Sequence, residues 1–360
     1  MRKIFLLSLT VLIIASCQPD TPKTPKPLTS EQIDDKFSSG VVLIKNVYYY
    51  TLSFGDDLDV YFTGVDSDGD PIGVTLEENE IKTDISFGTG FFVDKEGLIA
   101  TNHHVVNPTV NVGNIRSLFL SKLSSVSSQY QTDVNNMNVI MGALVSKIAD
   151  AESSYDRKRY TKELEELKEE RDEKQNFISA VTQLHGSNCS LRCNSSIGVA
   201  YNNTYVTNMS DFHDCVVRKG DEVHDLALIQ LKDKQTPEKC HVFKVSNNKD
   251  NGSDIGNKKL STKNVKDIKA GTELFMIAYN LGPVLALTKE GVMAQVTSGK
   301  VAQDRDDVIM YDIPSLHGSS GSPVLNKYGK LVAINFAGLD TEQGFNFGIK
   351  AHWLRELMNK

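Results

Sequence analysis

The sequence predicts an all-β fold that is interrupted once by long helices, and two observations support this. Short runs rich in Val, Ile, Tyr, Phe and Thr, broken by turn residues, fill residues 41–93 and 198–338. Runs of this kind are typical of strands joined by hairpins. Residues 114–184 differ, because they contain no proline and one glycine, Gly142. Many short strands without alternating helices favour a barrel or a pair of packed sheets.

The first residues predict export. Arg2 and Lys3 precede an apolar run over residues 4–14 and small residues that end at Cys17, which is the order found in a secretory signal peptide. The apolar run is too short for a permanent membrane span. Ile14-Ala15-Ser16-Cys17 resembles the bacterial lipobox, which implies cleavage after residue 16 and a lipid on the thiol of Cys17. An ordinary signal peptide with a chance cysteine is the alternative.

The next segment predicts an extended connection between lipid and folded body. Residues 18–32 hold four of the chain's ten prolines, a composition that disfavours packing. We therefore expect a signal peptide at 1–16, a lipid-anchored tether at 17–35 and a folded domain at 36–360. The expected location is a bacterial cell envelope, periplasmic or surface-exposed, with the membrane contacted through the N-terminal lipid.

Composition narrows the classes of partner. The chain carries a formal net charge of -7 and no basic block, which argues against nucleic acid as a partner. Its 40% hydrophobic content is ordinary for a globular protein.

Four cysteines remain besides Cys17, namely Cys189, Cys193, Cys215 and Cys240. An even number in an exported protein predicts two disulfides, with three connectivities open. Cys189 and Cys193 have no second pair of matching spacing, so we expect no zinc site there.

The interruption at about 114–184 predicts a helical hairpin inserted between two strands. Tyr160, Leu164 and Leu167 keep helical spacing, and Glu and Lys alternate at distances that suit a solvated helix face. A supporting role, a lid, a regulatory arm and an oligomer contact all remain open for it.

A short loop near the C-terminal end carries the first chemical signal. Gly318-Ser319-Ser320-Gly321-Ser322-Pro323 resembles the nucleophile loop of chymotrypsin-fold serine proteases. Acyl transfer needs a hydroxyl at a tight turn and two backbone N–H groups aimed at the developing oxyanion. The resemblance implies that Ser320 is the nucleophile and that the amides of Gly318 and Ser320 form the oxyanion hole. Ser322 stands where the Gly-x-Ser-x-Gly elbow of α/β-hydrolases needs glycine, which excludes that alternative.

Two further blocks resemble the same family. A serine nucleophile needs a base, and the base needs an acceptor that fixes its tautomer. The run "ATNHHVV" is similar to the base block of the HtrA branch of trypsin-like proteases, which implies that His104 is the base and His103 a variable neighbour. If both lie on a strand, their side chains face opposite ways. The run "HDLALIQL" is similar to the acid block, which implies Asp225, and the order His, Asp, Ser is that of chymotrypsin.

The resemblance covers residues 41–106 and 196–357 and implies two six-stranded β-barrels of chymotrypsin type with a long helical insertion and a C-terminal helix. One departure is Ala278-Tyr279-Asn280, where the family has Gly-Tyr-Pro. The short tail after Ser320 leaves no room for the PDZ domain of many HtrA proteins. We expect Trp353 to anchor the C-terminal helix on a barrel.

The resemblance also sketches a specificity pocket. Pro314 takes the place at its base, so cleavage after Lys or Arg is not expected. One wall should be the strand Phe336-Ala337-Gly338, which can pair with an extended peptide. Phe345 and Asn346 should approach from the other side, and small or medium apolar side chains are the expected preference.

An acidic run, "DSDGDPIGVTLE", places carboxylates at the ligand positions of an EF-hand loop. Its sixth position is Pro71, where that loop needs a glycine with positive φ. We expect a polar hairpin tip rather than a metal site.

Together these observations predict a lipid-anchored serine endopeptidase that hydrolyses envelope or extracellular polypeptides, with no cofactor and no metal. Two alternatives stay open: a protease-fold protein that binds peptides with little turnover, and an esterase that uses the same three residues.

Overall fold

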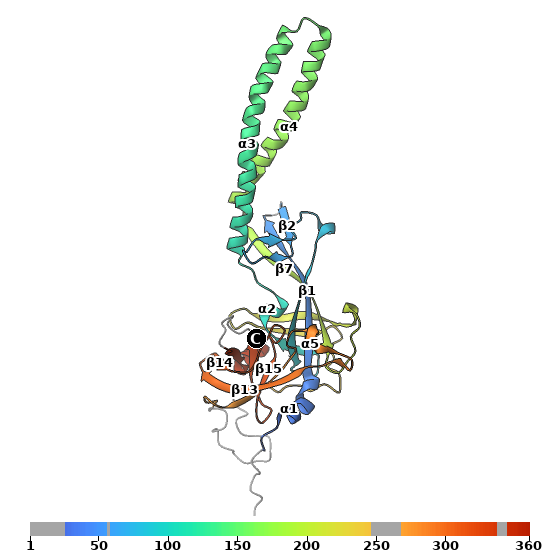
Figure 1. Ribbon diagram of the computed structural model, residues 1–360, viewed down its shortest axis with the longest axis vertical. Helices are drawn as coiled ribbons and strands as arrows, with labels where there is room; N and C mark the ends of the chain where they lie inside the picture. The colour runs from blue at the N-terminus through green and yellow to red at the C-terminus, as the bar shows by residue number, and fades with distance from the viewer. Residues whose placement is uncertain (1–25, 56–57, 246–267, 337–343) are drawn as a thin grey trace, which may run out of the picture.

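The computed structural model describes residues 26–55, 58–245, 268–336 and 344–360. Its body consists of two β-barrels, and a long helical hairpin projects from one of them (Figure 1). This confirms the predicted all-β class and its two six-stranded barrels of chymotrypsin type.

The first barrel is an antiparallel sheet that closes through the pairing of β1 with β7. Its strands, in order around the barrel, are β1 (Val41–Phe54), β5 (Asp84–Phe92), β6 (Leu98–Thr101), β9 (Leu226–Leu231), β8 (His213–Asp221) and β7 (Cys189–Tyr201). An additional strand, β2 (Leu58–Phe62), pairs with the far half of β1.

The second barrel is also closed. Its strands, in order, are β10 (Glu273–Ala278), β13 (Gln295–Asp304), β14 (Val308–Tyr311), β17 (Asn346–Lys350), β16 (Leu331–Phe336) and β15 (Pro323–Asn326). The connection from β10 to β13 contains a short helix, α5 (Pro283–Ala286). It also contains two short strands that pair with each other, β11 (Leu287–Thr288) and β12 (Gly291–Val292).

One hydrophobic core joins the barrels and fixes how they face each other. Its largest cluster holds Leu43 and Leu228 from the first barrel together with Ile277 and Ile334 from the second, all almost completely buried. Apolar burial of this kind is the main favourable term in folding. Because the barrels share this cluster, loops from both can form one site between them.

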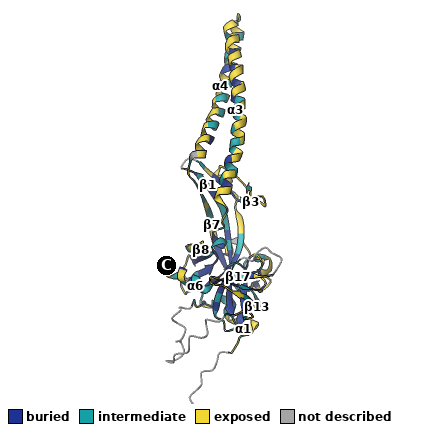
Figure 2. Cartoon of the chain, turned by 90° about the vertical axis from the view of Figure 1, so that its left-hand side faces the viewer, coloured by how far each residue is buried: buried dark blue, intermediate teal, exposed yellow. Residues whose placement is uncertain are grey.

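The helical insertion is confirmed as a hairpin of α3 (Val112–Asp150) and α4 (Ser154–Gly186). With 39 residues, α3 has a length of roughly 60 Å at the usual rise per residue. Met141 and Leu144 of α3 pack on Leu164 of α4, while most of the remaining hairpin surface is exposed (Figure 2). The long arm formed by β1 and β7 carries the base of the hairpin (Figure 1).

The N-terminal helix α1 (Ser30–Phe37) begins inside the segment expected to be an unpacked tether. Thr29 and Gln32 form a reciprocal capping box, and Ile33 is buried in the shared core. Both features favour a helix at this point. The expected signal peptide and Cys17 lie outside the described residues. Among the described helices, none is long and apolar enough to cross a membrane.

The predicted C-terminal helix is α6 (Ala351–Asn359), which packs against β8 and β9 of the first barrel and β16 and β17 of the second, with Leu354 and Leu357 buried. The acidic run folds as the expected hairpin tip, in which β3 (Gly64–Val65) pairs with β4 (Pro71–Ile72). Within the tip, a carboxylate oxygen of Asp66 accepts the backbone N–H groups of Asp68 and Asp70.

The prediction of two disulfides is wrong, because Cys189, Cys193, Cys215 and Cys240 are all free thiols. Cys189 and Cys193 lie four residues apart on β7, about 13 Å along an extended strand, which is too far for a bond. Cys215 and Cys240 instead pack in the core of the first barrel as small apolar side chains. Burial raises the pKa of Cys215 to about 12 and that of Cys240 to about 11, so both thiols stay protonated.

Candidate active site

Strand pairing brings the predicted base and acid together. β6 pairs antiparallel with β9, with Thr101 opposite Ala227. The short helix α2 (His103–Val106) follows β6, and Asp225 directly precedes β9. Asp225 has a φ of 48°, a left-handed conformation that Asp tolerates better than most residues. The fold therefore places His104 beside Asp225 across 121 residues of sequence.

His104 and Asp225 form two hydrogen bonds. Nδ1 of His104 lies 2.7 Å from Oδ2 of Asp225, and the backbone N–H of His104 donates to Oδ1 at 2.9 Å. Asn102 donates its side-chain amide to the carbonyl oxygen of Asp225 at 2.8 Å. A carboxylate only accepts, so the proton sits on Nδ1 and leaves Nε2 as an acceptor. That is the tautomer a general base needs.

His103 is held elsewhere. It begins α2 rather than lying on a strand, so the expected strand alternation does not apply. Consecutive helical residues point about 100° apart, which still separates the two histidines. Nε2 of His103 lies 3.0 Å from the side-chain amide of Asn107 and 3.8 Å from a carboxylate oxygen of Glu222.

The loop that holds Ser320 packs against the end of β6. Gly318 and Gly321 have φ values of 92° and 87°, which glycine adopts without strain. A Cβ on Gly321 would collide with the carbonyl oxygen of Thr89 and the hydroxyl of Thr101, and it would lie 3.2 Å from the backbone N of Asn102. The loop therefore lies beside the chain segment that leads directly into His104.

Besides the buried hydroxyl of Ser322, three polar groups of this loop have no hydrogen-bond partner among the described residues. The hydroxyl of Ser320 makes no hydrogen bond within the described part of the chain. The backbone N–H groups of Gly318 and Ser320 likewise donate to no described residue. Hydrogen bonds between nucleophile and base often tighten only when substrate is bound. Two N–H groups without an acceptor, on the same loop as a hydroxyl without a partner, suit the stabilisation of an oxyanion.

Residues 178–334 match the family model of the trypsin-like peptidase domain. This part of the chain is similar to a trypsin-like peptidase domain, and the two barrels are consistent with a chymotrypsin-like fold. The matched range includes Asp225 and Ser320 and begins within α4, so it leaves out His104. No curated protein matches the sequence.

Only some of the residues expected to shape the specificity pocket lie where the sequence predicts. Asn346 is buried and donates its amide to the carbonyl oxygen of Ile313, which fixes the chain just before Pro314. Pro314 itself is exposed rather than buried at a pocket base, and Phe345 is also exposed. Phe336 ends β16 and lies 6.0 Å from Phe347, centroid to centroid. Ala337 and Gly338 lie outside the described residues.

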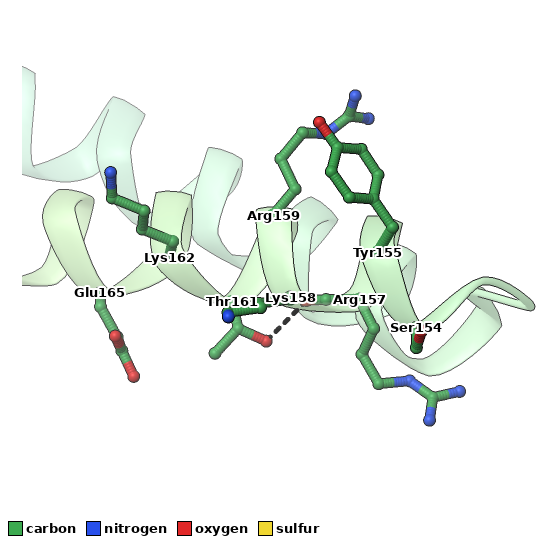
Figure 3. Close-up of a pocket in the computed structure, with 8 residues that line it drawn as sticks. All are labelled: Ser154, Tyr155, Arg157, Lys158, Arg159, Thr161, Lys162 and Glu165. Atoms are coloured by element: carbon green, nitrogen blue, oxygen red, sulfur yellow. Dashed lines mark hydrogen bonds between the residues drawn. The ribbon is translucent and has the colours of Figure 1, made fainter.

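A shallow hollow on the first turns of α4 is a separate feature. Arg157, Lys158, Arg159 and Lys162 extend around it (Figure 3). The hydroxyl of Thr161 bonds the carbonyl oxygen of Arg157 at 2.8 Å, an ordinary contact within one helix. The hollow lies on the hairpin, away from both barrels, and plays no part in the site of the trypsin-like domain (Figure 1).

Sequence reasoning missed three residues that bond the predicted site: Asn102, Thr89 and Asn335. Asn102 follows Thr101 in the base block, and its polar side chain at the end of an apolar strand is the signal that could have identified it. Thr89 stands between two glycines in "GTGFF", and Asn335 is the one polar residue of "LVAINF". A polar side chain at an otherwise apolar strand position predicts a buried hydrogen-bond partner.

Proposed function

We propose that this protein is a serine endopeptidase in which His104, Asp225 and Ser320 hydrolyse peptide bonds. The observation that carries the proposal is the doubly hydrogen-bonded His104–Asp225 pair beside the Ser320 loop. The match of residues 178–334, which include Asp225 and Ser320, to a trypsin-like peptidase domain supports it. A solvent-accessible base supports it, since the His104 side chain is 40% exposed.

The proposed reaction proceeds through an acyl-enzyme. Oγ of Ser320 attacks the peptide carbonyl carbon, and Nε2 of His104 takes the hydroxyl proton. The N–H groups of Gly318 and Ser320 stabilise the oxyanion, while Asp225 holds Nδ1 and balances the imidazolium charge.

Collapse of the tetrahedral intermediate breaks the C–N bond. His104 then returns its proton to the leaving amine, which departs as the new N-terminus. A water attacks the acyl-enzyme and gives its proton to His104. The second collapse releases the acid, and the proton on His104 returns to Ser320. No step needs a metal or a cofactor.

We also propose that the mature chain begins at Cys17, that a lipid on this residue holds the protein on a bacterial envelope membrane, and that the substrates are polypeptides there. The lipobox-like run before Cys17 and the proline-rich residues after it support this placement. Small or medium apolar side chains before the cleaved bond are the proposed preference, because the sequence has Pro314, and no carboxylate, at the position that the family resemblance assigns to the pocket base.

The proposal is tested by labelling the mature protein with a fluorophosphonate and incubating it with an unfolded protein. We expect one label on Ser320, cleavage of the polypeptide, and loss of both in Ser320→Ala. Ser322→Ala is the matched control, because its buried hydroxyl has no partner among the described residues. Labelling that persists in Ser320→Ala would refute the assignment.

The same assay separates the alternatives. Hydrolysis of small esters without cleavage of any polypeptide would identify an esterase. Binding of peptides without labelling or turnover would identify a peptide-binding protein that uses a protease fold.

A further inference from the structure

Thr89 of the first barrel is bonded to the Ser320 loop of the second at two points. Its hydroxyl donates to the carbonyl oxygen of Gly318 at 2.7 Å, and its backbone N–H donates to the carbonyl oxygen of Ser320 at 2.8 Å. The same hydroxyl accepts the backbone N–H of Tyr279 at 3.1 Å. Thr89 is fully buried. The hydroxyl of Thr89 therefore makes both its donor contact and its acceptor contact inside the protein.

Asn335 of β16 holds the loop from within the second barrel. Its amide nitrogen lies 3.1 Å from the carbonyl oxygen of Ser319 and 3.2 Å from the Ser319 hydroxyl. Its amide oxygen accepts the Tyr311 hydroxyl at 2.7 Å. Its backbone bonds both residues that follow Ser320, accepting from the N–H of Gly321 at 2.8 Å and donating to the carbonyl oxygen of Ser322 at 2.9 Å. Asn335 is fully buried.

These bonds set the direction of both oxyanion donors. The N–H and C=O of a trans peptide point opposite ways. The carbonyl oxygen of Ser319 faces Asn335, so the N–H of Ser320 faces away from it. The carbonyl oxygen of His317 accepts the N–H of Leu281 at 2.6 Å, so the N–H of Gly318 likewise faces away from Leu281. Thr89 then fixes the carbonyl on the other side of Gly318.

We propose that Thr89 and Asn335 are positioning residues that hold the oxyanion hole complete before substrate binds. The inference rests on the proposed peptidase function and adds that the active form needs neither processing nor a bound activator. Turning the Ser319–Ser320 peptide would deprive the buried amide of Asn335 of a partner, and turning the Gly318 carbonyl would deprive the buried hydroxyl of Thr89 of one. Both changes are costly in an interior without water. Thr89 and Asn335, which together form a clamp on the Ser320 loop, are both uncharged. The clamp therefore needs no ion pair in order to form.

The wild-type protein gives the first test. A complete hole predicts that labelling of Ser320 by a fluorophosphonate follows a single exponential without a lag. A non-cleavable peptide should slow labelling by competition and never accelerate it. Acceleration by the peptide, or a lag removed by processing, would show that the hole forms on binding and would overturn the proposal.

Variants of Thr89 give the second test. In Thr89→Val the shape is kept and the hydroxyl is lost, so we expect kcat per labelled site to fall about tenfold or more, with KM changed less than about twofold. Thr89→Ser keeps the hydroxyl and should stay within about threefold of the wild-type kcat. Thr297→Val is the matched control, because that buried hydroxyl has no partner among the described residues.

Asn335→Asp tests the second residue of the clamp. If Thr89→Val does not fold, this variant alone tests whether the clamp positions the oxyanion hole. A carboxylate cannot donate to the carbonyl oxygen of Ser319, so the N–H of Ser320 loses its orientation. We expect a peptide boronate, whose tetrahedral adduct places an oxygen in the hole, to bind at least about tenfold more weakly while KM is kept.

The outcomes distinguish this inference from the proposed function. A wild-type protein that neither labels nor cleaves refutes the function itself. An active wild-type protein, with kcat and boronate affinity in Thr89→Val and Asn335→Asp equal to those of Thr297→Val, refutes only the clamp. A loss shared equally by kcat and KM would show general disorder of the site rather than positioning.

Discussion

The imidazole of His224 stacks on the indole of Trp353, with ring centroids 3.7 Å apart and planes inclined by 21°. His224 directly precedes Asp225 in the chain, and Trp353 belongs to the C-terminal helix. Asp221 at the start of the same turn bonds Nδ1 of His224 at 3.0 Å. The turn that presents the acid is therefore held by the last helix of the chain.

Trp353→Ala should weaken the whole fold and the turn together. Loss of the stacked indole is expected to lower the free energy of unfolding by about 2 kcal/mol. Urea unfolding measures this loss. Tyr155→Ala removes an aromatic ring that is 75% exposed at the hairpin tip, and it should leave the unfolding midpoint unchanged. Equal midpoints for the two variants would contradict the anchoring role of Trp353.

Asp221→Asn should change how stability depends on pH. Burial raises the pKa of Asp221, but hydrogen bonds from His224, together with the charges of His224 and Lys360, outweigh that effect and lower the pKa below its ordinary 3.8. A carboxyl whose pKa is lowered by folding stabilises the protein above its unfolded pKa and loses that contribution as pH falls through the folded value. The variant should thus be less stable than wild type at neutral pH, with the difference shrinking below about pH 3.8. Thermal unfolding from pH 7 to pH 2 measures it, and a constant difference would contradict the linkage.

Asp225→Asn should remove most activity without removing the fold. An amide can donate to Nδ1 of His104 and so favour the tautomer with the proton on Nε2, which cannot accept the Ser320 proton. The expected fall in kcat is about 10⁴-fold, as for the equivalent change in other serine proteases. Glu222→Gln is the control, because its side chain is 72% exposed three residues earlier. Asp225→Asn with the kcat of the control would exclude Asp225 as the orienting acid.

Gly321→Ala should lower stability and activity by more than the positive φ of this residue alone would cause. The added Cβ would collide with Thr89 and Thr101. Gly271→Ala separates the two causes, because Gly271 has a similar φ of 83° and nothing within 4 Å of its Cβ position. We expect Gly271→Ala to cost about 1 kcal/mol of stability and keep activity. Gly321→Ala should cost more and abolish labelling of Ser320; equal effects would contradict the tight packing of the loop on β5 and β6.

The thiols should prove independent of one another. Alkylation of the unfolded, unreduced protein is expected to modify Cys189, Cys193, Cys215 and Cys240 fully, as measured by mass spectrometry. A reducing agent should not shift the thermal midpoint. A mass lower by two hydrogens per pair, or a midpoint that falls on reduction, would restore the disulfides that the cysteine count alone suggested.

The sequence predicted this fold and the groups proposed to react because both depend on short segments. Turn residues and β-branched runs mark the strands locally, and a proline-free stretch marks the helical hairpin. The three blocks around His104, Asp225 and Ser320 each carry the residues that a local backbone shape needs, such as Gly318 and Gly321 at positive φ.

Other features depend on neighbours that are distant in the chain. A bond between Cys189 and Cys193 is excluded because strand β7 spaces them along one extended segment, and Cys215 and Cys240 pack as free thiols in the first barrel. The helix α1 begins inside the segment expected to be an unpacked tether, because Ile33 packs into the core that the two barrels share. The strand expected at His103 gave way to the helix α2, in which His104 turns toward Asp225.

The sequence by itself determined which groups are present, namely an imidazole, a carboxylate and an alcohol on loops of two β-barrels. Only the tertiary structure decided how they are held. The hydrogen bonds from Thr89 to the Ser320 loop, and the stacking of Trp353 on His224 in the Asp225 turn, join elements far apart in the chain. Residues at such separations meet only when the two barrels close and share one core, and no local pattern encodes that meeting.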